Sequence, residues 1–402
     1  MAPAQLRALT MGGRDDMRPL ILGWGHTRFG KQPDATLESL VVEAGRAALE
    51  DAGVAPDEID LVVLGHFNSG MQPLGFPSSL ALQIDDGLFG VPALRTENAC
   101  ASGSAAVHTG LSHLMAGRAS KVLVIGAEKM TGIPAHVVGQ ALLGADYEAA
   151  GGESNTGFAD LFAEVALEYE RRYGPVGETL GEIAAKSHRF GAVNPFAHLR
   201  KDLGVDVCST VSERNPMVAA PLRRTDCSPV SDGAAALVLG TEPASPHHAA
   251  VRVAGWAFAS DHLPRARRDP LAFAATELAW RRALADAEVR RERLDLVELH
   301  DCFTIAELQL YEVLGLAPRG EGRRALADGS VLPGGELPVN PSGGLKSKGH
   351  PVGATGVSQH VMVAMQLTGT FPGVQIENAR VGAVHNMGGL AVANHVTILA
   401  VD

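Results

Sequence analysis

Two residues suited to nucleophilic catalysis lie in separate segments rich in glycine and other small residues. Cys100 lies in residues 96–104 (TENACASGS), after an expected strand and at the start of a long stretch without charged residues. His350 lies in residues 340–356 (NPSGGLKSKGHPVGATG), at the start of a second such stretch. At a helix N-terminus the dipole and free N–H groups favour a thiolate and can face an oxyanion. A cysteine and a histidine form a nucleophile with its base, although both residues also occur as ordinary core residues.

Two further segments each follow an expected strand. Residues 299–304 (LHDCFT) contain His300 and Cys302, and residues 385–389 (HNMGG) contain His385 and two glycines. Ligand sites in α/β sheets lie at the ends of strands, and glycines permit close approach of exposed amides. Both segments are therefore candidates for the same site.

The elements that would hold these segments are repeated. Residues 46–64 (RAALEDAGVAPDEIDLVVL) and 281–299 (RRALADAEVRRERLDLVEL) align with a constant offset of 235 and are identical at ten of nineteen positions. Each copy predicts a helix, a turn and a short buried strand. A Gly-Trp pair precedes each copy, and a charge-free stretch, 98–117 or 349–376, follows it. The pattern favours helices on largely parallel sheet, with the two charge-free helices buried on all sides between the halves.

This repeat predicts an α/β protein with five layers, α-β-α-β-α, and an internal pseudo-twofold axis. We expect a flexible extension over 1–18, an N-terminal half over 19–130 and 228–248, and a C-terminal half over 249–402. Residues 131–227 lack the repeat, are rich in glycine and proline, and include an amphipathic helix near 158–172. An insertion of this length is usually functional, so a substrate-binding loop domain is expected there.

Composition excludes several classes of protein. Hydrophobic residues make up 46% and charged residues 20% of the 402, which is an ordinary globular mixture. A net charge of −11 with scattered lysines argues against a nucleic-acid surface. The charge-free stretches contain histidine, glutamine and proline, which argues against a membrane span. Four cysteines without a CxxC pair predict reduced thiols, a cytoplasmic location and no metal site.

From about residue 19 to residue 402, the chain resembles the thiolases. Cys100 in NACASGS resembles their acyl-accepting cysteine, and GGLKSKGHPVGATG resembles their histidine motif. The HDCF segment at 300–303 and His385, where most thiolases have a second cysteine, resemble the sterol-carrier-protein type. Because the sequence ends at Asp402, no fused sterol-carrier domain is expected. The resemblance implies a thiolase-like sandwich, coenzyme A or acyl-CoA as substrate, and no permanently bound cofactor.

The same resemblance implies a role for each residue. Cys100 would be the nucleophile, His350 its base, Cys302 the proton carrier at the α-carbon, and His300 the holder of a water at the enolate oxygen. Met387 and Gly388 would supply amides to an oxyanion, with His385 orienting their loop. Residues expected to contact coenzyme A are Ser228, Lys346 and Lys348, the two lysines being equally well explained as a solvated pair.

The leading hypothesis is an acyl-CoA C-acyltransferase that cleaves 3-ketoacyl-CoA or runs the reverse condensation, in fatty acid or sterol side-chain metabolism. Alternatives are a C-acetyltransferase or another carbon–carbon bond-forming enzyme of secondary metabolism, a retro-aldolase, or a subunit that presents acyl-CoA to a partner. The thiol at Cys100 has no use in an aldolase. The resemblance also implies a homodimer or a dimer of dimers, and a possible small OB-fold, zinc-ribbon companion. Acyl chain length and reaction direction are not encoded in these motifs.

Overall fold

The computed structural model describes residues 18–154, 156–242 and 249–401. The expected N-terminal extension therefore lies, apart from Arg18, outside the described residues. Residues 243–248, which connect the two expected halves, lie outside them as well.

Nine strands form one hydrogen-bonded sheet in the order β3-β2-β4-β7-β1-β8-β11-β10-β9. The strands of the N-terminal half are β1 (Leu20–His26), β2 (Leu61–Gly65), β3 (Ala93–Thr96), β4 (Lys121–Glu128) and β7 (Gly233–Gly240). Those of the C-terminal half are β8 (Val251–Ser260), β9 (Leu296–Glu298), β10 (Val381–Gly388) and β11 (Ala393–Ala400). The halves join where β1 pairs with the start of β8.

The expectation of a largely parallel sheet is wrong. Among the described strands, parallel pairing is limited to β2 with β3, β2 with β4, and β9 with β10. The strands β7 and β11 pair antiparallel with their neighbours. The physical reason is connectivity: β11 returns directly from β10, whereas parallel neighbours need a crossover helix.

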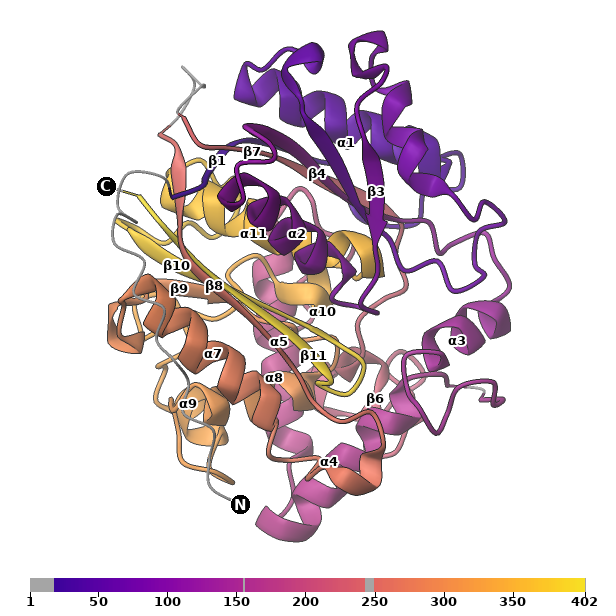
Figure 1. Ribbon diagram of the computed structural model, residues 1–402. Coiled ribbons are helices and arrows are strands. Elements are labelled where there is room, and N and C mark those ends of the chain that lie inside the picture. Colours follow the sequence, from indigo (N-terminus) through magenta and orange to yellow (C-terminus); the bar gives the residue numbers. More distant parts are fainter. Residues whose placement is uncertain (1–17, 155, 243–248, 402) are drawn as a thin grey trace, which may run out of the picture.

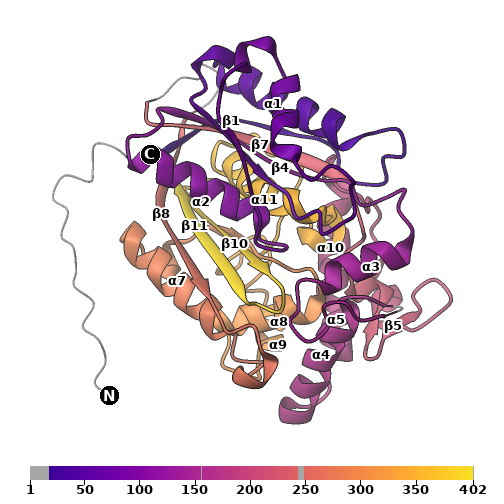
Figure 2. The same ribbon diagram turned by 45° about the vertical axis from the view of Figure 1, so that its right-hand side comes forward.

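Helices occupy three layers around the two halves of the sheet (Figures 1 and 2). The outer and central helices are α1 (Leu37–Ala52), α2 (Ser102–Met115), α7 (Ala274–Ala287) and α11 (Val352–Leu367). Three clusters of buried hydrophobic residues fill the layers: one beneath α1, one around α2 and α11, and one beneath α7. The five-layered arrangement is therefore confirmed.

The two halves repeat specific contacts as well as elements. The backbone N–H of Trp24 donates to Asp51 at 2.9 Å, and that of Trp256 donates to Asp286 at 3.1 Å. In each half this bond ties the first strand to the end of the outer helix. The internal repeat therefore extends to individual hydrogen bonds.

The central helices approach closely because glycine lies at their crossing. A Cβ on Gly103 would lie 2.8 Å from the Gly353 carbonyl oxygen, and one on Gly356 would lie 2.2 Å from the Ser104 nitrogen. Helix α11 is buried on all sides except at Met365. Helix α2, in contrast, exposes a stripe ending at Met115, which is 45% exposed, so its predicted burial on all sides is wrong.

The insertion and the C-terminal half add smaller elements beside the sandwich. Those of the insertion are α3 (Ala135–Leu143), α4 (Ala159–Tyr173), α5 (Gly177–Val193), α6 (Gly204–Ser209), β5 (Met217–Ala219) and β6 (Leu222–Arg223). Those of the C-terminal half are α8 (Thr304–Val313), α9 (Arg323–Ala327) and α10 (Gly344–Lys348). In the described part of the chain, no helix has both the length and the apolar character needed to cross a membrane.

Candidate active site

Cys100 lies in a tight turn between β3 and α2. The Ser102 hydroxyl accepts from the Asn98 backbone N–H at 2.9 Å and donates to the Ala99 carbonyl at 2.6 Å. Ala99 has φ of 50°, a left-handed conformation that costs a non-glycine residue about 1–2 kcal/mol. The surrounding hydrogen bonds therefore hold a strained turn, and this turn places Cys100 two residues before the start of α2.

His350 is held in one tautomer by the first turn of α11. Its Nδ1 lies 2.6 Å from the Thr355 hydroxyl, which itself donates to the Pro351 carbonyl at 3.0 Å. Because the hydroxyl proton is used on that carbonyl, the hydroxyl accepts from His350 Nδ1–H. The Nε2 lone pair of His350 is then free to accept a proton.

His300 is held in the opposite tautomer by Asn386. The Asn386 amide nitrogen lies 3.1 Å from the Cys100 carbonyl oxygen, which identifies it as a donor, and 2.8 Å from His300 Nδ1. His300 Nδ1 therefore accepts, and its Nε2 carries the proton. The His300 and His350 rings meet edge to face with centroids 5.1 Å apart. The site thus combines one imidazole acceptor and one imidazole donor.

One cavity of about 160 Å³ brings most of the predicted residues together. Cys100, Cys302, His350 and Ser228 all line it, with apolar walls that include Phe303. His300 lies behind this wall, with its nearest ligand atom within 4.8 Å of those of Cys100 and His350. Four segments far apart in the sequence therefore converge on one small, mainly apolar space.

The Cys100 side chain is a thiol at rest. Burial raises the pKa of Cys100 to about 12, against the smaller lowering effect of the Gly389 backbone N–H and of its own. The pKa of His350 falls to about 3 because of burial and the nearby Lys348 ammonium. The expected stabilisation of a thiolate by the helix N-terminus is therefore outweighed, because Cys100 is desolvated and α2 begins only at Ser102.

The second thiol is also protonated at rest. Cys302 is 6% exposed, and burial, Cys100 and Asp301 raise its pKa well above the ordinary value. The pKa of His300 falls well below its ordinary value because of burial and the neighbouring His350 and His385. The two thiols and the two imidazoles are therefore all uncharged at rest. Each can give or take up a proton when charge develops during a reaction.

Strand alternation in β10 separates His385 from the cavity. Ala383 and Met387 belong to the cluster beneath α7, whereas Val384 belongs to the central one. His385 accordingly shares the α7 side, where its ring lies 6.2 Å from that of Trp280 and its Nε2 lies 3.3 Å from Asn394 Oδ1. It does not line the cavity, and Asn386 takes the position facing Cys100.

The expected oxyanion donors are displaced along the chain. Met387 and Gly388 pair with Asn394 and Ala393 of β11, and neither lines the cavity. The backbone N–H that faces the Cys100 sulfur belongs to Gly389, the first residue after the strand.

The two lysines do not lie where phosphates could reach them. Lys346 is 1% exposed, with its ammonium 3.4 Å from His188 Nε2. Lys348 is fully buried, donates to Ser358, and has its pKa lowered to about 8 by burial. The prediction that they contact coenzyme A is wrong, because the short helix α10 packs into the interior instead of forming a solvated loop.

The ligand atoms of Cys100, His300 and His350 form a set that suits a metal ion by residue type, where the sequence predicted none. The hydrogen bonds argue against that use. His300 Nδ1 faces the Asn386 amide donor, so the proton stays on Nε2, the nitrogen that a metal would need. The arrangement is better suited to moving protons.

Sequence reasoning missed Thr355 and Asn386, and it named Gly389 only as one of two glycines with exposed amides, without assigning it as the oxyanion donor. Asn386 was detectable, because alternation in a strand puts it on the face opposite His385. Thr355 follows His350 by five residues in an expected helix, which gives no signal of a side-chain contact across a proline. Gly389 depended on where β10 ends, and strand ends are not fixed by sequence patterns.

The fold is a doubled α/β sandwich with a thiol just before a central helix, and comparison with known proteins identifies its family. Residues 20–243 match the family Thiolase, N-terminal domain, and residues 257–401 match Thiolase C-terminal domain-like. The chain belongs to the thiolase family.

Curated relatives cover most of the chain. An acetyl-CoA acetyltransferase of Methanothermobacter thermautotrophicus is 36% identical over 92% of this chain and 96% of its own length. A benzoylsuccinyl-CoA thiolase subunit of Thauera aromatica is 32% identical over 92% and 94%. Human sterol carrier protein 2 is 31% identical over 92% of this chain and 70% of its own length. The chain is therefore an acyltransferase, with homologues that include the sterol-carrier-protein type.

Solved structures share the fold at lower identity. An Ltp2-ChsH2(DUF35) aldolase has a TM-score of 0.78 at 22% identity, covering 96% of this chain and 98% of that one. A monomeric SCP2-thiolase-like protein from Mycobacterium smegmatis has a TM-score of 0.70 at 20% identity, covering 96% and 78%. These similarities establish the fold.

Proposed function

We propose that this enzyme transfers acyl groups by way of an acyl-Cys100 thioester, cleaving 3-ketoacyl-CoA or running the reverse Claisen condensation. The observation that carries the proposal is the convergence of Cys100, Cys302 and His350 on one cavity, with His350 Nε2 available as an acceptor. A thiol with a raised pKa needs such a base, because it does not ionise by itself at neutral pH.

In the cleavage direction, His350 Nε2 takes the Cys100 proton as the sulfur attacks the ketone carbon. The oxyanion that forms there faces the backbone N–H groups of Gly389 and Cys100, which are the amides nearest the sulfur. The bond between the α- and β-carbons then breaks, leaving the acyl group on Cys100 and the electron pair on the thioester enolate.

The enolate oxygen is stabilised by the proton now on His350 and by a water that His300 Nε2–H would hold. The Cys302 thiol protonates the α-carbon, and acetyl-CoA leaves. The Cys302 thiolate takes the thiol proton of incoming coenzyme A, whose sulfur attacks the acyl-Cys100 carbonyl, and Cys100 regains its proton from His350. Every residue ends in its starting protonation state, because the proton that Cys302 gives to acetyl-CoA is replaced by the thiol proton of coenzyme A, so the cycle closes without a further cofactor.

Coenzyme A would enter through a second cavity of about 760 Å³ that shares Met130, Leu142 and Phe158 with the first. Helix α3 lines this outer cavity, and Lys31 supplies the cation that Lys346 and Lys348 do not. Ser228 at the inner cavity would contact the pantetheine arm. These contacts support a role for the insertion in substrate binding.

The test is acylation. Mass spectrometry after mixing with acetyl-CoA should show one added acetyl group, which is lost in Cys100→Ala. A panel of 3-ketoacyl-CoA substrates of different length and branching then identifies the preferred acyl group. Absence of the acetyl adduct from the intact enzyme would contradict the covalent mechanism.

Two finer features accompany this proposal. The described cysteines are all free thiols, which suits the reducing cytoplasm.

A small OB-fold, zinc-ribbon companion is supported by the aldolase neighbour, whose second component is a DUF35 protein, and by the benzoylsuccinyl-CoA thiolase relative, which is a subunit. Co-purification of a tagged chain from its native host, with activity measured before and after removal of any companion, tests that partnership.

A further inference from the structure

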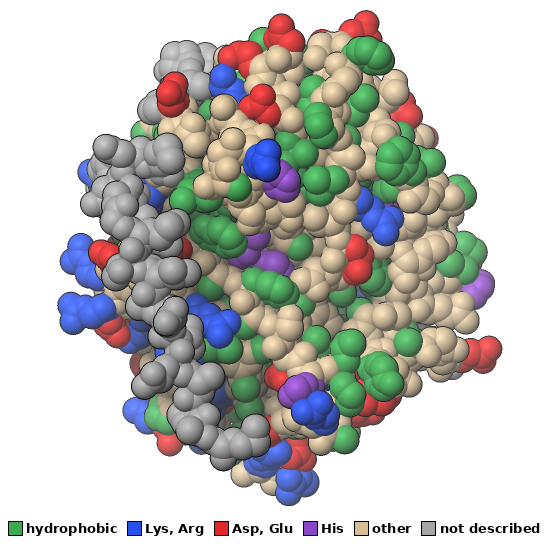
Figure 3. All heavy atoms as spheres, viewed as in Figure 1, with side chains coloured by type: hydrophobic (Ala, Val, Ile, Leu, Met, Phe, Trp, Pro, Cys, Tyr) green, Lys and Arg blue, Asp and Glu red, His purple; other side chains and the backbone are tan. Residues whose placement is uncertain are grey.

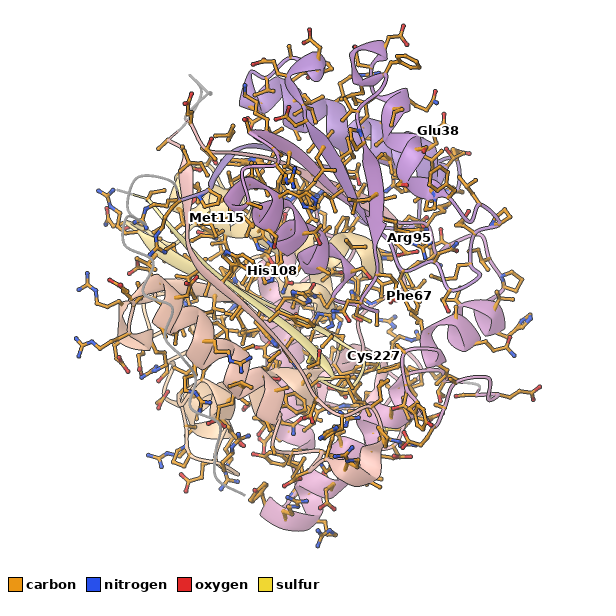
Figure 4. All side chains as sticks on the ribbon, viewed as in Figure 1. Glu38, Phe67, Arg95, His108, Met115 and Cys227 are labelled. Atoms are coloured by element: carbon orange, nitrogen blue, oxygen red, sulfur yellow. The ribbon has the colours of Figure 1, made fainter. Side chains whose placement is uncertain are left out.

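Three histidines that the reaction does not use form a buried chain behind the nucleophile. His108 lies on α2, His360 on α11 and His395 on β11, and all three are at most 5% exposed. Figure 4 labels His108 where α2 passes over the strands of the C-terminal half. Trp256 and Phe258 of β8 cover the chain, with ring centroids 4.9 Å from His108 and 4.4 Å from His395.

Five hydrogen bonds connect these residues in a single line. Asn98 Nδ2 lies 3.1 Å from His395 Nε2, and His395 Nδ1 lies 2.9 Å from His108 Nδ1. His108 Nε2 and His360 Nε2 lie 3.0 and 2.9 Å from the Thr397 hydroxyl. His360 Nδ1 lies 2.7 Å from the Gly356 carbonyl oxygen.

The carbonyl at one end determines the position of every proton. Gly356 O can only accept, so His360 carries its proton on Nδ1 and accepts on Nε2. The Thr397 hydroxyl therefore donates to His360 and accepts from His108 Nε2–H. His108 Nδ1 then accepts from His395 Nδ1–H. His395 Nε2 accepts from the Asn98 amide. Because an amide nitrogen is a donor, the assignment is consistent at both ends of the chain.

Both ends of this chain lie against the catalytic machinery. Asn98 is part of the Cys100 turn: its carbonyl accepts from the Ala101 N–H at 3.0 Å. A Cβ on Gly388 would lie 2.3 Å from the same carbonyl oxygen, so Asn98 also contacts the loop that carries Gly389. At the other end, a Cβ on Gly356 would lie 2.3 Å from Asn386 Oδ1.

We propose that the chain Asn98–His395–His108–Thr397–His360 is a positioning relay, which holds the Cys100 turn against the Gly389 loop and requires all three histidines to be neutral. The proposal rests on the role of Cys100 as nucleophile. Adding a proton to His108 or His395 would set two N–H groups against each other and break the line. The relay therefore supports the strained turn at Ala99 through Asn98.

The surroundings keep these histidines neutral. Burial lowers the pKa of His108 well below its ordinary value, that of His360 to about 4 and that of His395 to about 3. The charged or titratable groups that act on them are other histidines: His395 and His360 on His108, and His360 and His385 on His395. In the described part of the chain, no carboxylate contributes to these shifts.

The assignment of protons is tested in the intact enzyme by long-range proton–nitrogen correlation spectra of protein labelled with ¹⁵N-histidine. We expect His395 and His360 to be Nδ1–H tautomers and His108 to be an Nε2–H tautomer. Imidazolium, or an Nε2–H tautomer at His395 or His360, would overturn the relay. This readout requires no variant and does not depend on activity.

The positioning role is tested by Thr397→Val, which removes the central hydroxyl with little change of volume. We expect Cys100 acetylation at saturating acetyl-CoA to slow about tenfold or more, with half-saturation unchanged, because a misplaced nucleophile loses rate and not binding. Thr397→Ser should restore the rate. Thr109→Val is the matched control, since its hydroxyl on the same helix as His108 donates only to the Ala105 carbonyl.

Equal rates in Thr397→Val and Thr109→Val would overturn the relay as a positioning device. If Thr397→Val does not fold, Asn98→Ala replaces it, because Asn98 is only partly buried and its removal deletes the first donor. A wild-type enzyme that takes up no acetyl group would contradict the proposed function itself, and the tautomer spectra would still decide the relay.

Discussion

The Cys100 thiol holds its proton at rest, because burial raises its pKa to about 12, and so its reactivity depends on His350. In Cys100→Ser, we expect acetyl labelling and thiolysis to fall to less than about one hundredth, because a hydroxyl is a much poorer nucleophile beside one imidazole. The measurement is the intact mass after mixing with acetyl-CoA, together with the rate of ketoacyl-CoA cleavage.

Cys227→Ser is the control for that change, because Cys227 lines the same cavity and is also a free thiol. It should retain the acetyl adduct on Cys100. A Cys100→Ser enzyme that keeps more than about one hundredth of the rate would contradict an acyl-cysteine intermediate.

The roles of Cys302 and His385 can be separated by hydrogen exchange. Acetylation of Cys100 requires no α-proton removal, so Cys302→Ala should still become acetylated yet lose exchange of acetyl-CoA α-hydrogens with deuterated water. His385→Ala should keep the exchange, because its ring faces Trp280 and not the cavity. Survival of exchange in Cys302→Ala with loss in His385→Ala would reverse the assignment.

Among the elements, α11 begins with a device that orients the base. Thr355→Val should free His350 to place its proton on either nitrogen, since the hydroxyl that accepts from Nδ1 is gone. We expect the acetylation rate to fall about tenfold or more, with the rate recovered in Thr355→Ser.

Thr368→Val is the matched control for Thr355→Val, because Thr368 lies at the other end of α11 and its hydroxyl donates to the Ala364 carbonyl. It should retain the wild-type rate. Equal rates in the two valine variants would show that the tautomer is held by something other than Thr355.

The helices and strands show which parts of the structure could be predicted from the sequence. The repeat of 46–64 at 281–299 and the two charge-free stretches predicted the halves, the central helices and the convergence of Cys100 with His350, because these follow from hydrophobic pattern and chain order. The environment of Lys346 and Lys348 was not predictable in the same way. Two charged residues so close together are expected to be solvated, but packing against α5 and against the Phe29 ring encloses them.

The strands likewise have features that the sequence predicts and features that it does not. Short buried strands next to helices were correctly expected, but the directions of the strands were not. The directions of β7 and β11 depend on which strand each of them pairs with after a loop. His385 and Asn386 illustrate the consequence. Alternation places the two residues on opposite faces of the strand, but which face lies toward Cys100 depends on how β10 pairs within the sheet.

For the whole molecule, the buried histidines predict sensitivity to acid. Burial lowers the pKa of six of them from 6.5 to about 3 or about 4: His26, His188, His350, His360, His385 and His395. Below pH 6.5 the unfolded chain therefore binds more protons than the folded one. Their contribution to stability is fully present above pH 6.5 and is lost as the pH falls toward 4.

Two buried carboxyl groups act in the opposite sense, because burial raises the pKa of Glu298 and Asp301. They are outnumbered, so the free energy of unfolding should decrease from pH 7.5 to pH 5. Urea unfolding at the two pH values measures this directly. An unchanged or higher midpoint at pH 5 would contradict the neutral state of the histidine core.

The surface of the N-terminal half predicts an assembly of at least two chains. Strand β3 is at the end of the sheet order and pairs only with β2 among the described strands, so its other edge is available for a further strand. Beside it, α2 exposes Met115, and the face over α2 in Figure 3 carries apolar side chains with few charges.

A second copy of the chain would cover both features at once, because an isologous contact brings each β3 edge against its equivalent and stacks the exposed α2 stripes. Light scattering should therefore give a mass near twice 41.9 kDa. Met115→Glu places a charge in this contact and should weaken it, whereas Leu167→Glu, which changes a residue 51% exposed on α4, should not. A stable species of 41.9 kDa in the unmodified protein at working concentration would contradict the dimer, and Cys100 would then have to react without a neighbouring chain against its turn.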